Sequence, residues 1–78
     1  MNLKTVFMVV GAPGRFHISA EQLDTDAGRF VGFWSLLCDA RGCLLWFDTE
    51  EEAIARIEEL EERGLFVWDT NTKTCVCK

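Results

Sequence analysis

Residues 48–64, DTEEEAIARIEELEERG, carry the signals of an amphipathic helix that is marked at both ends. Thr49 and Glu52 have the spacing of a capping box, which satisfies the free amides of a first helical turn. Apolar residues recur at helical spacing and form one stripe of Ala53, Ile54, Ile57 and Leu60. Gly64 fits the left-handed position that ends many helices. The sequence therefore predicts one helix over residues 50–63.

The rest of the chain alternates between runs of strand-forming residues and turn residues. The expected strands pair as three hairpins: 4–10 with 15–19, 29–38 with 43–48, and 65–69 with 73–78. The polar stretch 20–28 is expected to connect the first two hairpins, with at most one helical turn. The predicted fold is α+β, as a single domain over residues 1–78. It has one antiparallel sheet of five or six strands in the order ββ-ββ-α-ββ, with the helix packed on one face.

The second expected hairpin carries more apolar surface than one helix can cover. If Cys38 pairs with Cys43, one face holds those two cysteines with Leu36, Leu45, Trp34 and Phe47. The other face then holds Leu37, Leu44, Ser35, Trp46, Phe33 and Asp48. A single apolar stripe covers one of the two faces, and an uncovered apolar patch usually marks an interaction site. We therefore expect Phe33 and Trp46 to bind a partner or a second copy, unless segment 20–28 or the curl of the sheet covers them.

Four cysteines allow three interpretations. Tetrahedral zinc binding would use Cys38, Cys43, Cys75 and Cys77, but C-x4-C and C-x-C are poorer matches to structural zinc sites than C-x2-C. Disulfides need an oxidising compartment, for which the sequence offers no convincing signal segment. The favoured interpretation is reduced cysteines that act as small core residues, with Cys38 and Cys43 on the apolar face, so no cofactor or metal is expected.

Little in the chain points to catalysis. VVGAPGRF, residues 9–16, places glycines after a strand, but it lacks the lysine and the Ser/Thr of a phosphate-binding loop and is typical of a hairpin turn. His17 and Ser19 share a strand face, with no further motif to complete a triad. We expect no enzymatic activity.

Charge points toward protein partners. The net charge is −5 and the eight basic residues are scattered, which disfavours direct binding to nucleic acid. Glu51, Glu58 and Glu62 lie on one side of the expected helix, away from its apolar stripe. This side is either a solvated face or a ridge that docks on a basic protein surface, where spaced carboxylates can imitate phosphates.

The stretch FDTEEEAIARIEELEERG, residues 47–64, resembles the strand-to-helix junction of small DNA-binding modules such as the arm-binding domains of phage integrases. Those modules read DNA with basic sheet residues, and here the sheet is apolar. In size and acidity the chain is similar to phage anti-defence proteins, including anti-CRISPRs.

The sequence thus favours a small acidic inhibitor or nucleic-acid mimic that binds a basic protein surface, or itself, through the acidic helix and exposed aromatics. A small zinc-binding module is the alternative. Because TVFMVV, residues 5–10, is short, β-branched and followed by a turn, we interpret it as a strand and expect a cytoplasmic protein without a membrane span.

Overall fold

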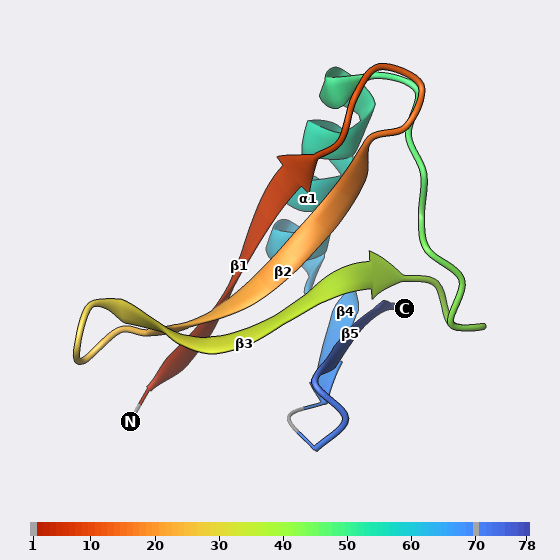
Figure 1. The fold of residues 1–78 in the computed structure, drawn as a ribbon. Helices are drawn as coiled ribbons and strands as arrows, with labels where there is room; N and C mark the ends of the chain where they lie inside the picture. Colours follow the sequence, from red (N-terminus) through yellow and green to blue (C-terminus); the bar gives the residue numbers. More distant parts are fainter. Residues whose placement is uncertain (1, 70) are drawn as a thin grey trace.

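The computed structural model describes residues 2–69 and 71–78, which form one five-stranded sheet and one helix (Figure 1). In chain order the elements are β1 (Leu3–Val10), β2 (His17–Asp24), β3 (Arg29–Cys38), α1 (Glu50–Arg63), β4 (Phe66–Asp69) and β5 (Thr74–Cys77). The strands lie in the order β1-β2-β3-β5-β4. The α+β class and the single helix are confirmed. The sheet is mixed, however, because β3 and β5 run parallel, so the prediction of a purely antiparallel sheet was wrong.

Helix α1 has the predicted bounds, and both of its caps form. The Thr49 hydroxyl accepts a hydrogen bond from the Glu52 amide at 3.2 Å. Gly64 takes the left-handed conformation, with φ of 62°, and its amide bonds the Leu60 carbonyl. Glycine reaches this conformation without a steric penalty, which is why the helix ends at this residue.

The first hairpin is confirmed, but its second strand is longer than predicted. Strand β2 continues through Asp24, so the expected polar connection over 20–28 is mostly strand. Ile18, Ala20 and Gln22 of β2 face the core, and Ser19 between them is buried on the opposite side of the sheet. Gln22 is tolerated in the core because its side-chain amide donates to the Thr5 hydroxyl at 2.9 Å.

The second predicted hairpin does not form. Strand β3 pairs with β2 instead, around a turn in which the Asp24 carboxylate accepts bonds from the amides of Asp26 and Ala27. Residues 43–48 form no strand. Cys38 meets Leu44 rather than Cys43, in an isolated bridge. The expected register of 29–38 with 43–48 was therefore wrong, because β2 extends through Asp24 and satisfies the backbone of β3 across the short connection 25–28.

Residues 44–47 form a strap between β3 and the first turn of the sheet. The Leu45 amide bonds the Leu37 carbonyl at 3.3 Å, and Phe47 exchanges two backbone bonds with Phe16. The strap lies where β2 and β3 diverge, as the green segment in Figure 1 shows. Leu45 and Phe47 are half-buried against the core, so the strap fills the gap between these two strands.

The third hairpin is confirmed, with Phe66 opposite Cys77 and Asp69 opposite Thr74. Strand β5 inserts between β3 and β4, which makes β4 an edge strand. The sheet curls, so that the Phe7 ring of β1, the other edge strand, packs edge-on against Phe66 of β4 with 5.0 Å between ring centroids.

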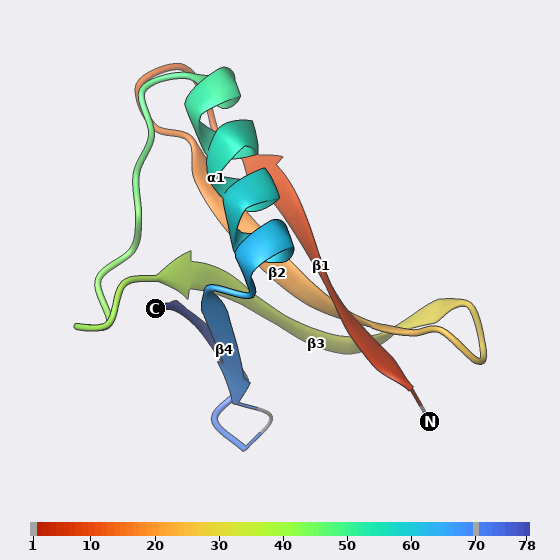
Figure 2. The same cartoon turned by 180° about the vertical axis from the view of Figure 1, so that it is seen from behind.

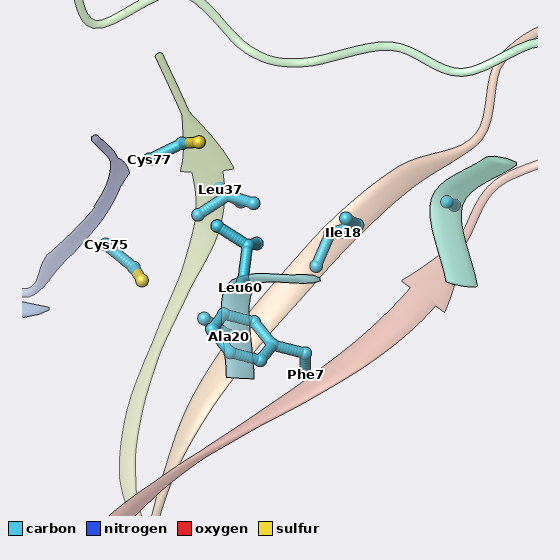
Figure 3. Close-up of a cluster of buried hydrophobic side chains, with 8 residues drawn as sticks. Phe7, Ile18, Ala20, Leu37, Leu60, Cys75 and Cys77 are labelled. Atoms are coloured by element: carbon cyan, nitrogen blue, oxygen red, sulfur yellow. The ribbon is translucent and has the colours of Figure 1, made fainter. Parts of the chain in front are cut away.

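The core lies between the sheet and α1, which covers β1 and β2 on one face (Figure 2). Its buried apolar members are Phe7, Ile18, Ala20, Leu37, Ala53, Leu60, Cys75 and Cys77. Figure 3 shows Leu60 of the helix pointing at Leu37, Ala20 and Phe7 of the sheet.

We predict that Leu60→Ala lowers the free energy of unfolding by about 2–5 kcal/mol, because Leu60 is fully buried and its removal leaves a cavity. Ile54→Ala is the matched control on the same helix. Ile54 is 41% exposed, so the loss there should stay below about 1 kcal/mol. Urea titration followed by circular dichroism measures both, and equal losses would contradict the described orientation of α1.

Candidate interaction surfaces

The sheet face opposite α1, termed the open face, is built from cross-strand rows. One row runs Met8, Ser19, Leu36 across β1, β2 and β3, and the next runs Val6, Glu21, Trp34. After an irregularity in β3, a third row runs Lys4, Leu23, Phe30. Residues directly opposite on paired strands point to the same face. These rows therefore form a continuous surface directed away from the helix.

Large apolar side chains are exposed on the open face: Met8 (47%), Phe30 (52%), Trp34 (62%), Trp46 (58%) and Val67 (48%). Trp46 projects from the strap and packs edge-on against His17 at 5.3 Å between ring centroids. Val67 lies opposite Val76 in the β4–β5 pair. Exposed to about half of their area, these side chains present on the order of 500 Å2 of apolar surface. Patches of this size on small proteins are often functional.

The two aromatics predicted to bind a partner lie on different faces. Trp46 is exposed on the open face, as predicted. Phe33 is half-buried on the helix side of β3, where the Lys73 ammonium lies 5.2 Å from the ring centroid. The prediction that Phe33 shares a face with Trp46 was wrong because it depended on the second hairpin. Sequence reasoning missed Trp34. In β2 the polar side chains of His17, Ser19 and Glu21 share one face. Because Trp34 lies opposite Glu21, this pattern could have indicated that Trp34 belongs to the face directed away from the core.

The acidic ridge, made of Glu51, Glu58 and Glu62, is exposed along the outer side of α1. The helix contains seven glutamates and two arginines, so its net charge is −5, the same as that of the whole chain. The remaining residues hold six acids and six bases and are neutral overall. Within the described part of the chain, the ion pairs of the helix both involve Glu59, with Arg56 at 3.0 Å and Arg63 at 3.4 Å.

The acidic ridge and the open face lie on opposite sides of the molecule. Figure 1 views the sheet with α1 behind it, and Figure 2 views it from the other side with α1 in front. A single flat partner surface cannot contact both. The acidic helix and the exposed aromatics, which the sequence suggested as one site, are therefore two separate candidate surfaces.

The four cysteines are free thiols, of which Cys38, Cys75 and Cys77 lie in strands and Cys43 lies in a loop. Cys75 and Cys77 are buried on the helix side (Figure 3), and the Arg56 guanidinium donates to the Cys77 sulfur. Cys38 is half-buried and lies opposite Val76, so it faces the other side. Among the described residues, no group of three or more Cys, His, Asp or Glu is arranged to hold a metal ion.

Cys43 is exposed, so its predicted place in the core was wrong. Without the second hairpin it belongs to a tight loop, in which the Asp39 amide bonds the Cys43 carbonyl at 2.8 Å. The Asp39 carboxylate in turn accepts a bond from the Cys43 amide at 3.0 Å. This loop replaces the four-residue turn that the sequence suggested.

His17 has a packing role in this arrangement. Its Nδ1 lies 3.4 Å from the Arg15 carbonyl, and its ring contacts Trp46. Ser19, its neighbour on the strand face, is buried beneath the open face.

Comparison with known proteins identifies no relative: no family model, no curated protein and no solved structure matches the chain. None of the described residues belongs to a helix with the length and hydropathy needed to cross a membrane.

Burial, and secondarily Cys77 and Cys38, raise the pKa of the Cys75 thiol from its ordinary value of 9.0 to about 11. Above pH 9 the unfolded chain therefore releases a proton that the folded chain retains. We predict that stability falls between about pH 9 and pH 11, by at most about 1.4 kcal/mol per pH unit for this thiol.

Urea titrations under reducing conditions between pH 8 and pH 11 test this loss. Cys75→Ala should be less stable at every pH but should show a shallower alkaline decline. Cys43→Ala, which removes an exposed thiol, should keep the wild-type decline. An unchanged decline in Cys75→Ala would contradict the assignment.

Proposed function

We propose that this protein is a non-enzymatic protein-binding module whose open face is the contact surface. The observation that carries the proposal is the exposure of Trp34, Trp46 and Met8 on the open face of a sheet whose other face already holds the core. Aromatic residues and methionine are enriched at the centres of protein interfaces. A partner that buries this face would gain roughly 25 cal/mol for each Å2 of apolar surface removed from water.

The distribution of charge supports this role. Because the whole net charge lies on α1, the open face combines apolar side chains with few charges. Its charged members in the cross-strand rows are Lys4 and Glu21, which sit in different rows. An interface core depleted in charge is the usual composition of a stable protein contact.

We predict that the double variant Trp34→Ser, Trp46→Ser loses the bound protein and stays folded. The matched control is Ile54→Ser, Ala55→Ser, which changes two exposed apolar residues of α1 away from both the open face and the edge of the sheet. Quantitative affinity purification from the source cells, with light scattering for self-association, measures the result. The control should retain whatever binds wild type, whether another protein or a second copy. Retention by the double variant as well would contradict an open-face interface.

A second candidate function is inhibition of a protein with a basic surface, in the manner of a nucleic-acid mimic. The observation that favours it is the concentration of all net charge on α1, with the acidic ridge exposed. Carboxylates spaced along a rigid helix can occupy cationic side chains that otherwise contact phosphates. In this arrangement the ridge makes the contact, and the open face remains available to another molecule.

For this candidate we predict that changing Glu51, Glu58 and Glu62 to lysine abolishes binding to a basic partner, mainly through a slower association rate. The fold should remain, since exposed substitutions change stability by about ±0.5 kcal/mol. The triple glutamine variant is the matched control and should lie between wild type and the lysine variant. Surface plasmon resonance at two salt concentrations measures the rates, and salt-independent binding that survives the reversal would remove the ridge from the interface.

A further inference from the structure

Strand β1 is an unprotected edge of the sheet. It has eight residues, and its register with β2 runs without irregularity from Leu3 to Val10. Proteins commonly shield an exposed edge with proline, a bulge, a very short strand or charged side chains such as lysine. Of these devices β1 has only Lys4, near its first residue. The edge can therefore accept another strand.

The backbone groups that point outward from β1 follow from its pairing. The Asn2 carbonyl accepts a hydrogen bond from the Thr25 amide at 2.9 Å. The backbone N–H and C=O groups of the even-numbered residues of β1 therefore point toward β2. In an antiparallel pair these bonded positions alternate with positions whose N–H and C=O point the other way. The outward positions are thus Leu3, Thr5, Phe7 and Val9. They offer an added strand four donors and four acceptors.

A cavity of about 300 Å3 opens beside this edge on the helix side, lined by Lys4, Thr5, Glu61 and Phe66. Phe66 is fixed by its contact with Phe7, and the Thr5 hydroxyl is fixed by Gln22. An added strand would alternate its side chains between the two faces of the sheet. One set would therefore point toward this cavity, and the other would continue the open face.

The side of α1 above β1 is acidic. Glu61 lines the cavity, and Glu58 lies one turn earlier on the same side of the helix. Within the described part of the chain neither carboxylate is in an ion pair. Lys4 also lines the cavity, although its row faces the open side, so the helix side of the edge holds one cation against two carboxylates. This net negative charge favours a partner that carries positive charge.

The same charges disfavour a second copy of the chain at this edge. Two antiparallel β1 strands related by a two-fold axis would form one continuous sheet, with both helices on the same face. Each helix carries a net charge of −5, and like charges placed side by side repel. A basic segment meets no such penalty.

We propose that the edge of β1 binds an extended segment of a partner protein in which apolar residues alternate with Lys or Arg. The segment adds a sixth strand to the sheet, and its basic side chains reach Glu61 at the cavity. Backbone bonds to the outward positions supply affinity, and the cavity supplies selectivity, as in other cases of strand addition. This inference rests on the proposed function as a protein-binding module and names one class of partner.

The probe is a synthetic octapeptide in which valine alternates with lysine, titrated into 15N-labelled protein. It should shift the β1 amides and protect them from hydrogen exchange. A valine–glutamate octapeptide should not bind, and neither should a valine–lysine peptide methylated on alternate backbone nitrogens.

Two matched pairs of variants locate the contact. Thr5→Pro removes an outward amide and should weaken binding at least tenfold relative to Thr5→Ala, which removes the same hydroxyl and keeps the amide. Glu61→Lys should weaken binding at least tenfold, whereas Glu62→Lys, which changes the neighbouring ridge residue, should leave it within a factor of three. Circular dichroism confirms that each variant is folded.

Absence of binding by the valine–lysine peptide, or equal binding by the glutamate and methylated peptides, would overturn the proposal. So would a Thr5→Pro variant, folded by circular dichroism, that binds as well as Thr5→Ala. Failure of the proposed function has a different signature. In that case the open-face variants retain every bound protein, whereas failure of the edge site alone leaves open-face binding intact.

Discussion

The packing of Leu60 and Ala53 onto Phe7, Ile18 and Ala20 is the contact on which the rest of the structure depends. Each large side chain that is fully buried in this way contributes roughly 1.5–3 kcal/mol. A chain of 78 residues has few such contacts, and α1 has one apolar stripe to offer. Covering one face of the sheet takes the buried part of that stripe, Ala53 and Leu60 with Ile57 beside them. The opposite face is then left to the strap and to whatever binds the protein.

The separation of charge follows from the same constraint. The outer side of α1 contacts no other element, so it can hold exposed glutamates at little cost in stability. The sheet and loops are neutral overall, and the open face is apolar. A single helix on a curled sheet thus produces three surfaces with different chemistry: an apolar face, an acidic ridge and an open strand edge. Each suits a different contact, and these surfaces are the basis of the binding role that we propose.

Features of the fold that depend on neighbouring residues could be predicted from the sequence. Helix α1 was predicted with its bounds because each end is set within one turn of the chain, by Thr49 with Glu52 at the start and by Gly64 with Leu60 at the end. The hairpin of β4 and β5 was predicted for the same reason. The pairing of β3 could not be predicted by adjacency, since 43–48 and β2 are equally close to β3 in the chain and both are apolar or alternating runs. The consequences of that choice, the faces of Phe33 and Trp34 and the exposure of Cys43, could not be predicted either.

The central claim is that one face of the sheet is covered by α1 and that the opposite face is a protein interface. Hydroxyl-radical footprinting of the three tryptophans tests it most directly, in the purified protein and in its complex isolated from cells. Trp68 packs against the core and serves as the internal reference. The account predicts that Trp34 and Trp46 are oxidised several times faster than Trp68 in the isolated protein and are protected in the complex. Equal oxidation of all three in the isolated protein, or undiminished oxidation of Trp34 and Trp46 in the complex, would contradict it.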